Sequence, residues 1–138
     1  MRAIQVTETG GPEVLRLTEL PDPKPGPGQL LVELAATGVN YIDTYHRSGA
    51  YPMPLPFIPG SEGAGTVTAV GPGTGDFAVG DLVAWATSPG SYAELAVVPA
   101  EQAVPVPPGR GLRDRGGQPA PRHDRALPHG VRACRATR

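Results

Sequence analysis

The chain has 138 residues, including 19 glycines, 18 prolines and one cysteine, and its formal net charge is −1. A single cysteine excludes a disulfide framework and no apolar run is long enough to cross a bilayer, so we expect a cytoplasmic protein without a membrane partner. The charge is uneven, because residues 1–109 carry −7 and residues 110–138 carry +6.

The first third of the chain has the pattern of short strands. Residues 2–6 and 14–20 alternate as strands do, and Gly10-Gly11-Pro12 between them is a turn signal. The proline-rich segment 21–28 predicts an extended connection, since proline has no N–H for a β-ladder. Residues 29–37 are apolar on both faces, which indicates a central strand.

Residues 40–47 predict one short helix. Asn40 is a suitable N-cap, and Asp43 lies in the first turn, where the helix dipole favours an acid. Asp43 and Arg47 are four residues apart, so we expect them to form an ion pair. Gly49 supplies the stop.

The pattern then returns to strands, which we expect at residues 63–70, 82–86, 91–98 and near 103–106. Glycine-rich turns separate them. Several short strands with regular turn signals and a single helix indicate a mainly β protein, either a barrel or a sandwich.

Residues 110–138 differ in composition from the rest of the chain. They contain eight arginines and few large aliphatic residues, so we expect a disordered tail that cannot bury enough apolar surface to fold. A basic arm for nucleic acid is the alternative, but the tail has no lysine and no aromatic residue for base stacking. We therefore expect no nucleic-acid partner.

Polar aromatic residues are concentrated in one segment. Tyr41 and Tyr45 lie on one face of the expected helix, and Tyr51 follows after a turn. A tyrosine hydroxyl can donate a hydrogen bond to a carbonyl oxygen that gains negative charge. The alternative for each tyrosine is ordinary packing. Asn40 and Arg47 also have structural explanations that need no ligand. Asn40 can serve only as a helix cap, and Arg47 only as the partner of Asp43.

Metal and phosphate motifs are missing from the sequence. His123, His129 and Cys134 have no recognised ligand spacing, and residues 1–109 contain no cysteine and only His46, so we expect no metal site. The glycines at 60–65 and 71–80 precede strands, and they match neither a Walker loop nor a dinucleotide-binding fingerprint.

Five segments, in order and in spacing, resemble the N-terminal half of the zinc-independent NADPH:quinone oxidoreductases. These form the zeta-crystallin-like group of the medium-chain dehydrogenase/reductase superfamily. The segments are GGPEVL at 10–15, GVNYIDTYHRSGAYP at 38–52, PGSEGAGTVTAVG at 59–71, VGDLVAW at 79–85 and GSYAELAVVP at 90–99.

The resemblance implies that residues 1–109 form a GroES-like, partly open β-barrel catalytic domain. In complete members a Rossmann domain, absent from this chain, follows and binds NADPH, and hydride passes to a quinone or an α,β-unsaturated carbonyl. Zinc-dependent members have cysteine at the position of Asn40 and histidine at that of Ser61, so the resemblance also implies a metal-free site.

By the same resemblance, the site residues line the cleft near the nicotinamide. Asn40 is expected to orient the NADPH cofactor, and Arg47 is a second candidate for cofactor contact. Tyr45 and Tyr51 are the expected catalytic residues, which shape the quinone pocket and donate hydrogen bonds to the substrate oxygen. The implied partner is a small quinone or enone, and intact relatives are expected to be homo-oligomers.

The sequence departs from the family after Gly109. Family members continue with an alanine-rich helix and the Rossmann domain, whereas here the arginine-rich segment 110–138 follows. We hypothesise that a frameshift replaced the continuation and truncated the protein, and we expect weak or absent activity in isolation. The alternatives are a metal-free enoyl reductase domain and a non-catalytic barrel fragment or interaction module.

Overall fold

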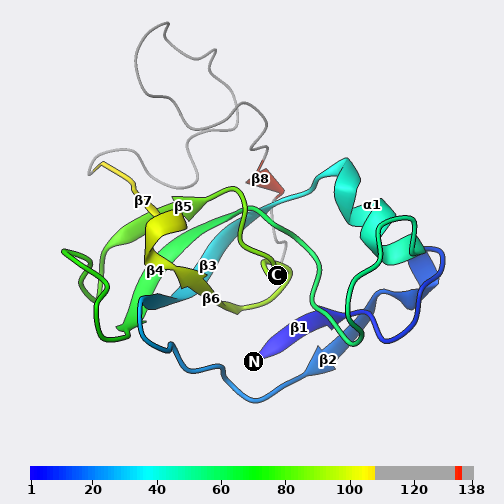
Figure 1. Ribbon diagram of the computed structural model, residues 1–138, viewed down its shortest axis with the longest axis horizontal. Coiled ribbons are helices and arrows are strands. Elements are labelled where there is room, and N and C mark those ends of the chain that lie inside the picture. Colours follow the sequence, from blue (N-terminus) through cyan, green and yellow to red (C-terminus); the bar gives the residue numbers. More distant parts are fainter. Residues whose placement is uncertain (108–132, 135–138) are drawn as a thin grey trace, which may run out of the picture.

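One long strand lies at the centre of the structure. The computed structural model describes residues 1–107 and the backbone of residues 133–134 (Figure 1). The elements in chain order are β1 (Arg2–Gln5), η1 (Pro12–Val14), β2 (Arg16–Glu19), β3 (Gln29–Gly38), α1 (Tyr41–Ser48), β4 (Gly63–Val70), β5 (Leu82–Trp85), β6 (Leu95–Pro99), η2 (Ala100–Gln102), β7 (Val104–Pro105) and β8 (Ala133–Cys134).

The main sheet has six strands and is built around β3. Its order is β6-β3-β4-β5-β7, and β8 also pairs with β3. All the pairs are antiparallel, and the pairing of β3 with β4 shifts register between Leu31 and Val32 and again between Leu34 and Ala36. Such irregularities increase local twist and bend a sheet. The sheet curls into the partly open barrel that the resemblance implied (Figure 1).

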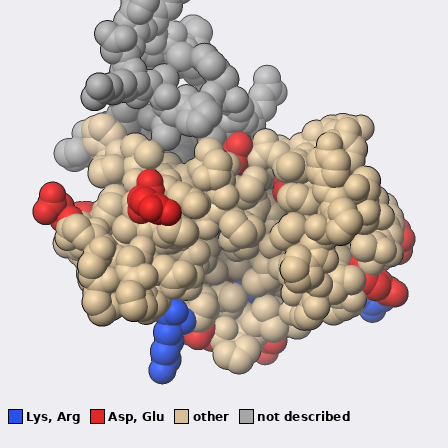
Figure 2. Space-filling model, in the orientation of Figure 1, with Lys and Arg blue, Asp and Glu red and all other residues tan. Residues whose placement is uncertain are grey.

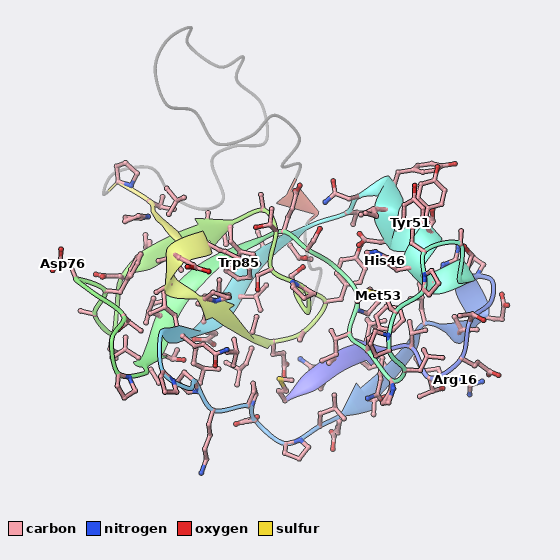
Figure 3. All side chains as sticks on the ribbon, in the orientation of Figure 1. Arg16, His46, Tyr51, Met53, Asp76 and Trp85 are labelled. Atoms are coloured by element: carbon pink, nitrogen blue, oxygen red, sulfur yellow. The ribbon has the colours of Figure 1, made fainter. Side chains whose placement is uncertain are left out.

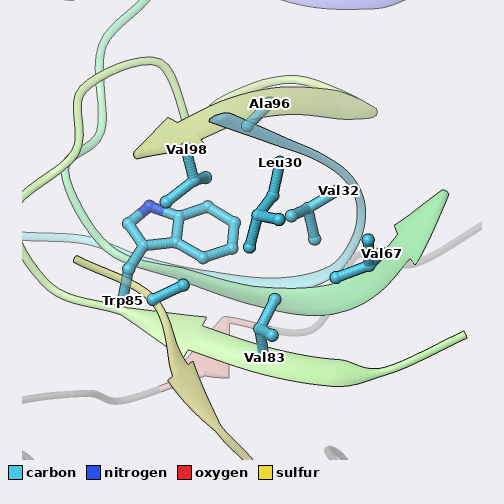
Figure 4. Close-up of a cluster of buried hydrophobic side chains, with 8 residues drawn as sticks. Leu30, Val32, Val67, Val83, Trp85, Ala96 and Val98 are labelled. Carbon is cyan, nitrogen blue, oxygen red and sulfur yellow. The ribbon is translucent and has the colours of Figure 1, made fainter. Parts of the chain in front are cut away.

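The core fills the inside of this curled sheet. Leu30 and Val32 of β3 are fully buried, which confirms the expected central strand. They pack with apolar side chains from β4, β5 and β6, including the indole of Trp85 (Figure 4). The cluster consists of Leu30, Val32, Val67, Val83, Trp85, Ala96, Val98 and Ala103.

The β1–β2 pair and α1 lie together at one end of the molecule (Figure 1). The β1 strand joins the segment before β6, because the Ile4 N–H donates to the Tyr92 carbonyl at 2.8 Å. The C-terminal turn of α1 is held by the N-terminal loop, where the Gly10 N–H donates to the Arg47 carbonyl at 3.0 Å.

The expected helix is present, and Gly49 ends it in the left-handed conformation with φ of 85°. Two of the expected strands begin two or more residues later than predicted. Val14 lies in η1, because Pro12 begins a 3₁₀ turn in which the Leu15 N–H donates to the Pro12 carbonyl. The segment predicted at 91–98 is a strand only from Leu95 onwards, since residues 91–94 bond to β1 and to the Pro59–Gly60 turn.

The predicted tail at 110–138 lies outside the described residues, apart from β8. The backbone of Ala133 and Cys134 in β8 pairs with Gly38 and Thr37 of β3. The sequence pattern did not predict β8. No helix in the described part of the chain is long and apolar enough to span a membrane.

Candidate functional site

Three tyrosine rings form an exposed aromatic cluster on α1 and the turn that follows it. We use this name for Tyr41, Tyr45 and Tyr51. The ring centroids of Tyr41 and Tyr45 are 5.4 Å apart at an interplanar angle of 70°, and those of Tyr45 and Tyr51 are 5.2 Å apart at 57°. These are favourable edge-to-face and tilted geometries. The Tyr51 N–H donates to the Tyr45 carbonyl at 3.2 Å and so fixes the turn.

The cluster presents its rings to solvent. Tyr41 is 76% exposed, Tyr51 54% and Tyr45 40%. Packing in a core, the alternative considered for each tyrosine, is therefore not what the structure shows. Figure 3 places Tyr51 beside α1, at the opposite end of the molecule from Asp76.

Asn40 caps α1, and its side-chain amide nitrogen has no partner among the residues that the structure describes. Its backbone is extended, with φ of −117° and ψ of 152°, and its N–H donates to the Asp43 carboxylate at 3.0 Å. The side-chain Nδ2 is buried and has no hydrogen-bond partner within the described structure. A buried unpaired amide is costly to a fold, so this donor is a candidate for ligand contact. Capping alone does not account for it.

The Asp43 carboxylate holds the start of α1 in place. It is 8% exposed and accepts a hydrogen bond from the Tyr92 hydroxyl at 2.8 Å, in addition to the Asn40 N–H. The expected ion pair with Arg47 is wrong, since Asp43 points to Tyr92 and no such pair occurs in residues 1–107. Sequence reasoning missed Tyr92, because nothing in its spacing connects it with a residue 49 positions away.

Arg47 is directed at the N-terminal loop. Its Nη1 donates to the Gly10 carbonyl at 3.1 Å, which is within reach because the two backbones also bond at this point. Its charge also acts on Glu13. The pKa of Glu13 lies below its usual value, chiefly because the carboxylate accepts from the Glu13 and Gly11 N–H groups, and to a smaller extent because of Arg47.

Polar groups gather where β3 ends and β4 begins. The Thr37 hydroxyl lies 2.8 Å from the Ser91 hydroxyl and 3.0 Å from the Glu62 carbonyl oxygen. Glu62 Oε2 is buried without a partner among the described groups. A Cβ at Gly38 would collide with the Glu62 side chain, so a larger residue there would displace Glu62. Sequence analysis did not select Glu62, since its segment was interpreted only as a turn.

No group of three or more histidine, cysteine, aspartate or glutamate side chains that could hold a metal ion occurs in the part of the chain that the structure describes. His46 lies half-buried on α1. Among the expected site residues, the rings of Tyr45 and Tyr51 are in contact with each other. Asn40 and Arg47 lie at opposite ends of α1.

Residues 26–108 match the family model described as the alcohol dehydrogenase GroES-like domain. The quinone oxidoreductase of Pseudomonas aeruginosa is 50% identical over 110 residues, which cover 78% of this chain and 34% of that protein. The chain therefore spans about a third of the length of this curated relative.

Solved structures agree with the sequence match. A mycobacterial quinone oxidoreductase is 54% identical with a TM-score of 0.75, and the match covers 78% of this chain and 34% of that one. The Escherichia coli quinone oxidoreductase complexed with NADPH is 39% identical with a TM-score of 0.75, and the match covers 78% of this chain and 33% of that one.

Proposed function

The chain belongs to the alcohol dehydrogenase GroES-like domain family, and from this premise we propose that it carries the substrate-binding half of a zinc-independent NADPH:quinone oxidoreductase site. The reaction would reduce a quinone or an α,β-unsaturated carbonyl compound. The quinone oxidoreductases to which the chain is similar support this reaction class. Residues 1–109 would form the catalytic domain.

The observation that carries the proposal is the exposed aromatic cluster beside an unpaired buried amide. Tyr45 and Tyr51 are in ring contact and partly exposed, so their faces can pack on a flat carbonyl compound and their hydroxyls can donate to its oxygen. Hydrogen-bond donors of this kind stabilise negative charge that develops on a reduced carbonyl. Tyr45 and Tyr51 are therefore the proposed catalytic residues.

The described residues fit the nicotinamide end of NADPH. The buried Nδ2 of Asn40 has no partner among residues 1–107, and the carboxamide oxygen of a nicotinamide would satisfy it. NADPH would supply the hydride. Arg47 is proposed as a second contact, for phosphate or substrate, and would keep its bond to the Gly10 carbonyl.

Residues 1–107 include no glycine-rich turn that opens a helix, the arrangement that binds a pyrophosphate. We expect a weak affinity for NADPH and slow turnover in this chain, because most of the contacts to the cofactor would have to come from elsewhere. We also propose a cytoplasmic location and homo-oligomers in full-length relatives.

The test measures quinone binding by the full chain. Duroquinone is suitable because its ring is fully substituted and does not add to the Cys134 thiol. Tyr45→Phe and Tyr51→Phe should each weaken binding by about two- to tenfold, the usual effect of losing one hydrogen bond. Val79→Ala is the control, since Val79 is 65% exposed and lies in the loop that contains Asp76. Equilibrium dialysis measures the affinity, and NADPH oxidation measures turnover.

Two results would overturn the proposal. The first is a wild-type chain that shows no saturable binding of duroquinone. The second is binding that neither tyrosine variant changes relative to Val79→Ala, since the hydroxyls would then have no role.

A further inference from the structure

Tyr41 extends the aromatic cluster by one ring beyond the proposed catalytic pair. The Tyr45 ring is in contact with both the Tyr51 ring and the Tyr41 ring. Tyr41 is also the most exposed of the three, at 76%. It lies in the first turn of α1, next to the Asn40 cap. The function proposed above gives this ring no role.

The chain beside Tyr41 is apolar. Val39 and Ile42, which are close to Tyr41 in the sequence, are exposed hydrophobic residues. Figure 2 shows this end of the molecule mostly without the colours of charged residues. An exposed aromatic surface of this kind favours an apolar, flat ligand.

The charges of α1 are engaged elsewhere. The Asp43 carboxylate is bonded to the Tyr92 hydroxyl and to the Asn40 N–H, and it is only 8% exposed. The Arg47 guanidinium donates to the Gly10 carbonyl. A carboxylate-bearing ligand over Tyr41 would therefore find no cation directed at it from α1, whereas a neutral ring loses nothing there.

We propose that Tyr41 determines substrate size, by packing against the second fused ring of a neutral bicyclic quinone whose quinone ring contacts Tyr45 and Tyr51. This inference rests on the proposed function, because it needs a quinone at that pair. A monocyclic quinone would contact only Tyr45 and Tyr51, and a fused ring would extend toward Tyr41. The chain therefore prefers naphthoquinones to benzoquinones of equal substitution.

The effect belongs to the ring of Tyr41 and does not depend on its hydroxyl. An aromatic contact contributes about two- to tenfold in affinity beyond the area that it buries. Tyr41→Ala should therefore lower the affinity for the bicyclic quinone by about two- to tenfold more than the affinity for the monocyclic one. Tyr41→Phe keeps the ring and should preserve the preference. Because Tyr41 is exposed, neither change removes a core contact.

The experiment compares duroquinone with 2,3-dimethyl-1,4-naphthoquinone by equilibrium dialysis on the full chain. Both compounds are neutral and have no free ring position on the quinone, so neither adds to the Cys134 thiol. They differ in that a fused ring of the naphthoquinone takes the place of two methyl groups of duroquinone. The proteins are the wild type, Tyr41→Ala, Tyr41→Phe and the control Val79→Ala.

The outcomes separate this inference from the proposed function. Loss of the naphthoquinone preference in Tyr41→Ala, with the preference kept in Tyr41→Phe and Val79→Ala, supports the inference. If both quinones bind and Tyr41→Ala changes neither affinity or changes both equally, the inference is overturned and the quinone site stands. If neither quinone binds to the wild type, the proposed function and the inference are both overturned.

Discussion

At the scale of single residues, the hydrogen bond between Tyr92 and Asp43 is expected to stabilise the site. The acceptor is a buried carboxylate, and hydrogen bonds to charged groups contribute about 1.5–3 kcal/mol. Tyr92→Phe should lower the free energy of unfolding by about this amount, as measured by urea denaturation. Tyr51→Phe is the control, because Tyr51 is exposed and should change stability by less than about 0.5 kcal/mol. An equal stability of the two variants would contradict the prediction.

The same two residues show what a sequence can reveal about a site. Tyr41 and Tyr45 were found because helix periodicity places near neighbours on one face, and Asn40 was found as a suitable N-cap. The partner of Asp43 was not, because local spacing pointed to Arg47 while the fold brought Tyr92 to it from the loop before β6. Contacts between distant segments depend on tertiary structure, which no local pattern contains.

At the scale of elements, the bond network between Arg2 and Glu94 joins β1 to the segment before β6. Glu94 accepts from the Arg2 N–H and from Arg2 Nε, each at 2.8 Å. The pKa of Glu94 is lowered by these bonds, first by the backbone N–H and then by the side chain. The folded-state pKa is thus below the unfolded-state value of about 4.3. The stabilisation is present above that value and is lost as the pH falls through the folded-state pKa.

The prediction compares two variants along this pH range. Glu94→Gln should not show the loss of stability at acid pH that protonation of Glu94 causes in the wild type. The difference in free energy of unfolding between the two proteins should therefore shrink as the pH falls below about 4.3. Arg2→Gln should remove only part of it, because the Arg2 N–H remains. Urea denaturation at a series of pH values measures both. If the free energy of unfolding differs between wild type and Glu94→Gln by the same amount at every pH, the predicted pH dependence is wrong.

Element boundaries were predicted less well than elements. The apolar pattern of 29–37 identified β3, which pairs with β4 along one edge and with β6 along the other. Only the face that carries Leu30 and Val32 is buried, whereas Glu33 and Ala35 on the opposite face are exposed. Val14 was assigned to a strand because it continues the alternation, yet the φ angle set by Pro12 favours a 3₁₀ turn there. Residues 91–94 directly precede the apolar run of β6, but their hydrogen bonds go to β1 and the Pro59–Gly60 turn.

At the scale of the whole molecule, glycine and proline placement predicted a β-barrel or sandwich, but it could not predict β8. A two-residue strand has no periodicity to detect, and its partners lie almost a hundred residues earlier, at Thr37 and Gly38. The barrel was chosen over the sandwich by the resemblance to a family, since both architectures share the same local pattern.

Residues 1–109 are proposed to be the folding unit of the chain. Every residue of the buried cluster lies between Leu30 and Ala103, and β8 adds only a two-residue pairing to β3. A chain that ends at Gly109 should therefore unfold in one cooperative urea transition, with a free energy of unfolding within about 1 kcal/mol of the full chain. A second chain that ends at Arg132 isolates the contribution of β8. A larger loss in both shortened chains would place part of the stabilising structure in residues 133–138, and the domain boundary at Gly109 would then be wrong.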